Sequence, residues 1–105
     1  MVLLEFSIAP FDKGSSVSEY VAKALRVIDD SGLDYQLTPM GTIIEGDWLK
    51  VMGVVDECFK VMSKESDRVV MQIKVDYRKD RVGRIKGKVQ SVEKIIGKKL
   101  SKWFI

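Results

Sequence analysis

The sequence contains no histidine and a single cysteine, Cys58, among its 105 residues. The lack of histidine excludes catalytic triads and general bases built on imidazole, and it excludes zinc sites with histidine ligands. One thiol can form neither an internal disulfide nor a cysteine-rich metal cluster. We therefore expect no metal site and no cofactor, and we expect a reducing, cytoplasmic environment.

Long apolar runs are also absent. No stretch of 18 apolar residues occurs, so we expect no membrane span and no membrane partner. The first ten residues, MVLLEFSIAP, lack a basic leader and soon reach Glu5, unlike a secretory signal. Hydrophobic residues make up 46% of the chain and charged residues 31%, as in folded globular proteins. These values predict a single domain over residues 1–105.

Charge is distributed unevenly along the chain. Residues 78–105 hold 10 basic and 2 acidic side chains, a net charge of +8. Residues 1–77 hold 8 basic and 13 acidic side chains, a net charge of −5. Such a division favours self-association, because the basic segment of one copy can complement the acidic remainder of another.

The hydrophobic pattern predicts both strands and helices. Alternating apolar side chains and short turns predict strands over residues 2–10, 33–38, 42–46 and 68–77. Apolar residues at helical spacing predict two helices, one after the capping box of Ser16 and Glu19 and one capped by Asp47. A last amphipathic segment carries an apolar stripe of Val89, Val92, Ile95, Ile96 and Leu100.

This order of elements is typical of an α+β, ferredoxin-like βαββαβ domain with a four-stranded antiparallel sheet, here with an extra C-terminal helix. Two helices cover one sheet face, and the other face remains open. A polar ligand site or a homo-oligomer interface is the use we expect for this open face. The strand phases predict that it carries Leu3, Glu5, Ser7, Gln36, Thr38, Gln72, Lys74 and Asp76.

Three segments, SSVSEYVAKALRVIDDSGLDYQLTPMGTIIEGDW, RVVMQIKVDYRKDR and KVQSVEK, closely resemble the thiamine-binding protein family, which comprises small archaeal and bacterial proteins related to the YkoF-like proteins. The resemblance covers nearly the whole chain, and its specific part is SGLxYxLxPMGTxxEG, from Ser31 to Gly46. It implies a ferredoxin-like fold and association through sheets into homodimers and often homotetramers. It also implies binding of thiamine, or of its pyrimidine or thiazole relatives, without catalysis.

Thiamine is a permanent cation with two heteroaromatic rings, so its site needs carboxylates, aromatic or methionine surface, and hydroxyls or amides. We expect Glu45 or Asp76 to neutralise its charge and Met40 to contact a ring. The complete set of expected ligand-binding residues is Ser7, Ser18, Thr38, Met40, Gly41, Thr42, Glu45 and Asp76.

Each of these residues also has a purely structural explanation. The segment around Met40 makes an ordinary hairpin, and the serines near residue 18 can simply cap a helix. Asp76 and Lys74 can form an intersubunit or cross-strand salt bridge on the open face instead of contacting a ligand. Core packing is favoured for Trp48, and Cys58 is expected to be an inert core residue.

We expect no catalytic residues, because no nucleophile or cofactor loop accompanies the acids. The basic C-terminal segment, residues 78–102, raises the alternative of a phosphate- or nucleic-acid-binding module. RNA-binding sheets of this fold stack bases on aromatic side chains, whereas the central strands here carry Glu5, Ser7, Gln72 and Lys74. Our prediction is therefore a non-enzymatic, cytoplasmic, homo-oligomeric binding protein for thiamine or a related small molecule, with no nucleic-acid partner. An oligomeric regulatory or structural protein without thiamine binding is the other alternative.

Overall fold

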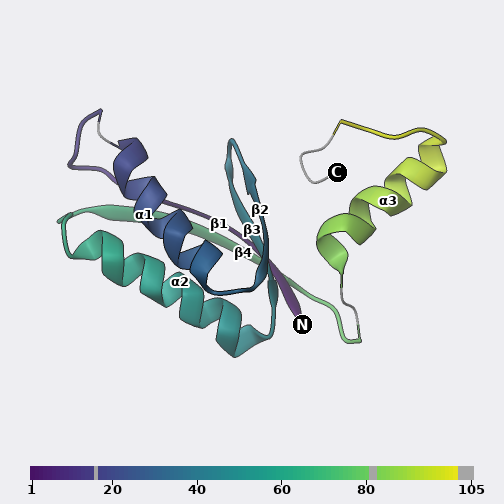
Figure 1. Cartoon of the computed structure of the whole chain (residues 1–105), viewed down its shortest axis with the longest axis horizontal. Helices are drawn as coiled ribbons and strands as arrows, with labels where there is room; N and C mark the ends of the chain where they lie inside the picture. The colour runs from purple at the N-terminus through teal and green to yellow at the C-terminus, as the bar shows by residue number, and fades with distance from the viewer. Residues whose placement is uncertain (16, 81–82, 102–105) are drawn as a thin grey trace.

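The computed structural model describes residues 1–15, 17–80 and 83–101, and it confirms the predicted α+β fold (Figure 1). The predicted cap at Ser16 lies outside these residues. Strands and helices follow one another in the predicted order, strand, helix, strand, strand, helix, strand and a last helix. The elements are β1 (Val2–Pro10), α1 (Val17–Asp30), β2 (Asp34–Thr38), β3 (Gly41–Gly46), α2 (Trp48–Ser63), β4 (Val69–Tyr77) and α3 (Arg84–Ile96).

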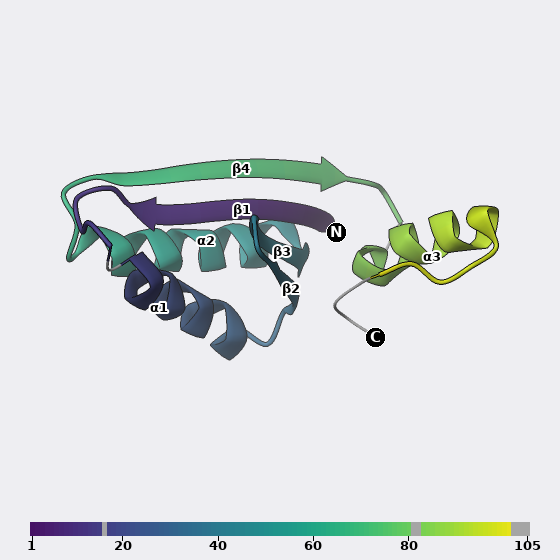
Figure 2. The ribbon, with the colours of Figure 1, turned by 90° about the horizontal axis from the view of Figure 1, so that it is seen from above.

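The four strands form one antiparallel sheet in the order β2-β3-β1-β4. Phe6 of β1 pairs with Thr42 of β3 and with Ile73 of β4, which sets the register of the centre. Helices α1 and α2 cover one face of this sheet (Figure 2). The core between the layers is formed by Val2, Leu4, Phe6, Ile8, Ala24, Ile28, Ile44, Val51, Val55, Cys58 and Met62.

Helix ends follow the predicted signals in part. Helix α1 ends where the Ser31 hydroxyl donates to the carbonyl of Ile28 and Gly32 takes a left-handed φ of 77°. Asp47 occupies the N-cap position of α2 with extended backbone angles, as predicted. Its side chain makes no capping hydrogen bond, so the predicted role of its carboxylate was wrong.

Trp48 corrects a second expectation, since 51% of its surface is exposed and it does not lie in the core. The buried stripe of α2 is centred on Val51, Val55 and Cys58. At 100° per residue, Trp48 falls at the margin of this stripe rather than in its middle. Phe59 lies at the same margin and is also partly exposed.

Helix α3 projects from the body of the molecule. It lies beyond the end of the sheet at which β1 begins and β4 ends (Figure 2). The molecule measures 47 × 29 × 21 Å, with a radius of gyration of 15.0 Å. A compact domain of this length has a radius of gyration of about 13 Å. The projection of α3 along the long axis accounts for this extended shape.

Candidate functional site on the open sheet face

Pairing across the sheet arranges the open face in three rows of side chains. Successive rows are two residues apart along each strand, or about 7 Å. The first row is Asp34, Glu45, Leu3 and Asp76, the second is Gln36, Ile43, Glu5 and Lys74, and the third includes Thr38, Gly41, Ser7 and Gln72. The open face predicted from strand phase is therefore confirmed.

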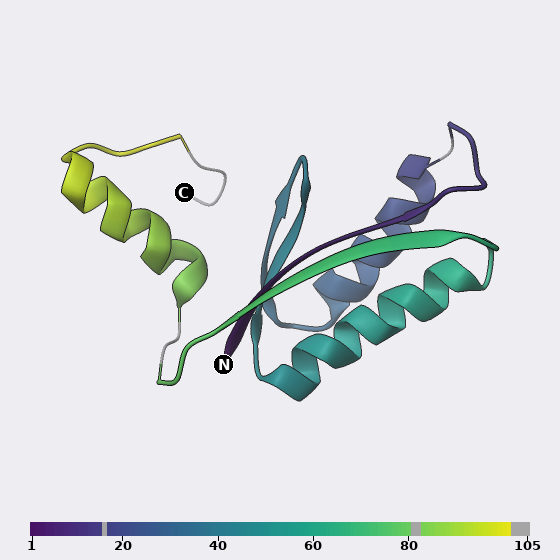
Figure 3. The same cartoon turned by 180° about the vertical axis from the view of Figure 1, so that it is seen from behind.

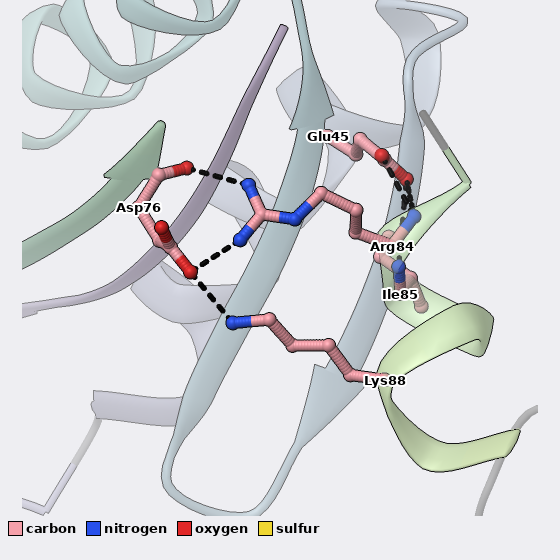
Figure 4. Close-up of polar contacts among 5 residues, drawn as sticks. All are labelled: Glu45, Asp76, Arg84, Ile85 and Lys88. Carbon is pink, nitrogen blue, oxygen red and sulfur yellow. Dashed lines mark hydrogen bonds and ion pairs between the residues drawn. The ribbon is translucent and has the colours of Figure 1, made fainter. Parts of the chain in front are cut away.

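The first row lies beneath the start of α3 (Figure 4). Glu45 is only 4% exposed, and its carboxylate accepts hydrogen bonds from the backbone N–H of Arg84, at 2.9 and 3.1 Å, and of Ile85, at 3.5 Å. The N-cap of α3 is Gly83, which has no side chain to satisfy these donors. A carboxylate from β3 thus performs the capping that usually comes from the helix's own N-cap residue, and it complements the positive end of the helix dipole.

Asp76, in β4, contacts the start of α3 through side chains of that helix. The buried guanidinium of Arg84 donates to the Asp76 backbone carbonyl at 3.0 Å and also pairs with the Asp76 carboxylate. The Lys88 ammonium lies 2.6 Å from that carboxylate. Hydrogen bonding from Lys88, with a further contribution from Arg84, lowers the pKa of Asp76 below its ordinary value of 3.8. The salt bridge considered for Asp76 therefore exists, with partners on α3 rather than on a neighbouring strand.

The second row lies in an open groove along β1 and β4. One hollow of about 210 Å³ is lined by Glu5, Ser7, Met40, Gln72 and Lys74, among others. A second hollow of about 390 Å³ reaches α3 and is also lined by Glu5 and Lys74. Because the hollows share these two residues, they form one groove, which we call the open-face groove. Neither charged side chain has a hydrogen-bond or ion-pair partner within the described part of the chain.

The hairpin between β2 and β3 presents Met40 at one end of this groove. The Thr38 hydroxyl accepts from the Met40 N–H at 3.2 Å and donates to the Gly41 carbonyl at 2.8 Å, so it is used within the turn. A side chain at Gly41 would place its Cβ 2.9 Å from the Phe6 carbonyl oxygen, so only glycine fits. Met40 is 86% exposed and free to contact a ligand.

The eight predicted residues are only partly brought together. Glu45 and Asp76 lie in the first row and Ser7, Thr38 and Gly41 in the third, about 13 Å apart along the strands. Thr42 is buried on the helix-covered face, and Ser18 is exposed at the start of α1. Their predicted roles in binding remain predictions.

Glu5 on the sheet face and Arg84 on α3 were not singled out from the sequence. Glu5 was recognised as part of the open face, but its central position in the groove depends on how three strands align. Arg84 belongs to a basic segment with many similar residues, and nothing in that segment marks it as the one that is buried. Only the glycine before it, Gly83, hints that a helix begins there without a capping side chain.

Three further features of the described ranges bear on function: the grouping of acidic and cysteine side chains, the apolar character of the helices and the Cys58 thiol. In residues 1–15, 17–80 and 83–101, no three His, Cys, Asp or Glu side chains gather closely enough to hold a metal ion. None of the helices in these ranges is both long and apolar enough to cross a membrane. Burial raises the pKa of the Cys58 thiol to about 11.

Comparison with known proteins identifies the family. A family model described as "Thiamine-binding protein" matches residues 4–93. A UPF0045 protein from Mycobacterium bovis is 41% identical over 96 residues, which cover 90% of this chain and 94% of the relative. The crystal structure of a hypothetical protein from Methanocaldococcus jannaschii is 37% identical, with a TM-score of 0.80 over 87% of this chain and 94% of that one. A Bacillus cereus domain of unknown function is 30% identical, with a TM-score of 0.77 over 86% and 88%. The chain therefore belongs to the thiamine-binding protein family.

Proposed function

We propose that this protein binds thiamine, or a related pyrimidine or thiazole compound, in the open-face groove without changing it chemically. The observation that carries the proposal is the Glu5 carboxylate at the middle of that groove, which has no partner among the described residues, in a chain of the thiamine-binding family. A carboxylate in a partly enclosed groove attracts a permanent cation more strongly than one in open solvent.

The groove also offers the other groups that such a ligand needs. Met40 supplies polarisable surface for a ring, and Ser7 and Gln72 supply hydroxyl and amide groups for exocyclic substituents. The distance of about 13 Å from the third row to the first suits two rings joined end to end. In this arrangement Glu5 takes the role first expected of Glu45, whose carboxylate caps α3.

We further propose that the protein works as a homo-oligomer through the free edge of β4. Viewed from behind, β4 runs along the edge of the sheet (Figure 3). Ile73, Val75 and Tyr77 remain 44%, 39% and 63% exposed on its helix-covered side. A long, partly apolar edge strand is a ready template for pairing with another strand.

An antiparallel pair of β4 strands centred on Ile73 suits this edge. In that register Gln72 opposes Lys74 of the second copy, so like charges do not face each other. We expect Ile73→Lys to reduce the mass in solution, whereas the control Gln72→Thr, an uncharged change on the opposite side of the strand, should reduce it far less. An unchanged mass for Ile73→Lys would contradict pairing through β4.

We place this assembly in the cytoplasm, where the single thiol of Cys58 stays reduced.

Isothermal titration calorimetry with thiamine tests the binding proposal. The hydroxymethylpyrimidine and thiazole halves serve as comparators, at two salt concentrations. We expect saturable binding to the wild-type protein and at least a tenfold loss of affinity in Glu5→Gln, because the charge pair is removed. Met40→Ala should also weaken binding, and its exposure means that the fold is unaffected. Glu57→Gln, a charge change on the far side of the molecule, is the matched control.

The absence of heat with all three compounds would contradict the proposal. Binding that Glu5→Gln and Met40→Ala leave unchanged would show that the groove is not the site. Heat with polyanions alone, lost at high salt and in variants of residues 84–99, would favour the nucleic-acid alternative.

A further inference from the structure

Helix α3 carries an apolar stripe that the described chain leaves largely uncovered. Ile85, Val89, Val92 and Ile96 recur at spacings of four, three and four residues and so share one face of the helix. The polar contacts described between α3 and the sheet lie near the start of the helix, where Glu45 and Asp76 hold Arg84 and Asp76 also pairs with Lys88. Val92 is 47% exposed and Ile96 52%. A helix of 13 residues is marginally stable in water by itself, so this stripe needs a partner surface.

The positive charge of α3 limits which surface can cover its apolar stripe. Residues 84–101 hold six basic side chains and one acidic side chain, a net charge of +5, whereas residues 1–77 carry −5. Packing two α3 helices against each other would bring like charges together. The acidic body of a second copy of this chain offers the opposite sign, and opposite charges also speed association.

The groove between α1 and α2 matches the stripe. It is a hollow of about 490 Å³ whose walls include Val27, Leu33, Leu49 and Val54. Its charged lining residues are Asp30, Glu57 and Lys50, two acidic and one basic. Leu49 is 82% exposed, and together with the other apolar walls of this hollow it adds to a contiguous apolar surface of the kind that marks interaction sites. An amphipathic helix that lays its apolar face into such a groove is a common mode of recognition.

Gly53 in the same groove supports this match independently. It lies inside α2, where glycine is less favourable than alanine. A Cβ at this position would meet nothing within 4 Å, so packing within the chain does not require glycine. A glycine does allow the backbone of another helix to approach closely.

We propose that α3 of one copy docks through Ile85, Val89, Val92 and Ile96 into the α1–α2 groove of a second copy. The contact joins two different surfaces, so each copy offers one helix and one groove. It uses neither the β4 edge nor the open-face groove, and it therefore adds to the assembly proposed above.

Two substitutions at exposed positions test the contact without disturbing the core. Val92→Glu places a charge on the stripe, and Leu49→Glu places one in the groove. Glutamate suits a helix interior, so both variants should fold, as circular dichroism would verify. Gln90→Glu is the matched control, because Gln90 is exposed on α3 and lies about 160° around the helix from Val92.

Sedimentation equilibrium of the full chain measures the effect. We expect Val92→Glu and Leu49→Glu each to raise the apparent dissociation constant of the assembly roughly tenfold or more, and the control to change it little. An equal mixture of the two variants should form a larger species than either alone, because one supplies an intact groove and the other an intact helix.

Other outcomes would overturn the proposal. If Val92→Glu leaves the mass unchanged, no second copy covers the stripe. If Leu49→Glu alone has no effect, the groove is not the partner surface. A mixture that shows no gain in mass would rule out a contact between two different surfaces.

Discussion

The Glu45 carboxylate in β3 accepts a hydrogen bond of 2.9 Å from the backbone N–H of Arg84, the first residue of α3. A strand and a helix 39 residues apart are joined by this capping contact. The same helix turn holds Asp76 through the Arg84 side chain, so one turn of α3 connects β3 with β4. The position of α3 at the end of the groove depends on this polar connection.

Removing the cap should loosen α3 without unfolding the sheet. We expect Glu45→Ala to cost about 1 kcal/mol, the usual loss for a missing cap, and to speed amide exchange at Arg84 and Ile85. Glu45→Gln keeps one side-chain oxygen as an acceptor and should lie between the wild type and Glu45→Ala. Exchange rates that are the same in all three proteins would contradict the capping role.

Asp76 should make the free energy of unfolding depend on pH in the acidic range. Its pKa is lower in the folded protein than its ordinary value of 3.8, so ionised Asp76 stabilises the fold above that pH. This contribution should be lost as the pH falls through the lower, folded-state value. We expect urea midpoints of the wild type and Asp76→Asn to differ at pH 6 and to converge in strong acid. A difference that stays constant between pH 6 and pH 2 would contradict this origin.

Gly41 should tolerate no side chain. In Gly41→Ala the new Cβ would lie 2.9 Å from the Phe6 carbonyl oxygen, so β1 and the hairpin must move apart. We expect a loss of roughly 1–3 kcal/mol, measured by urea denaturation. The comparison variant is Gly87→Ala, inside α3, where nothing lies within 4 Å and helix propensity favours alanine. Equal effects of the two substitutions would show that the close approach at Gly41 is unimportant.

Cys58 should be chemically silent in the native protein. It is fully buried, its thiol donates weakly to the Ala24 carbonyl at 3.5 Å, and its pKa of about 11 keeps it protonated at neutral pH. A thiol reagent at pH 8 should react only as fast as the protein unfolds, and at full speed in urea. Rapid reaction of the folded protein would show that the site opens locally.

The sheet and its two covering helices could be predicted from sequence because their signals are local. Alternation in residues 2–10 and helical spacing after Asp47 give element type and orientation directly. The side on which Ser7 and Thr42 lie also follows from counting residues along a strand. Trp48 failed this reasoning, since its apolar character does not reveal that it lies at the margin of a buried stripe.

The site was harder to predict because it combines residues from distant elements. Glu45 was recognised as important, but its partner is the start of α3, and the sequence contains no pattern that joins a strand carboxylate to a helix 39 residues later. Glu5 looked like an ordinary polar residue of an exposed face. Its place at the centre of the groove follows only from the alignment of β1 with β3 and β4.

The most direct test of the central claim is to map thiamine onto the protein by amide chemical shifts in solution. We predict that titration with thiamine shifts the amide signals of Glu5, Ser7, Met40 and Gln72. The shifts should grow with the fraction of protein bound and then saturate. Signals on the far surface, such as Gly53 and Glu57, should stay in place. No shifts, or shifts confined to the groove between α1 and α2, would contradict binding on the open sheet face.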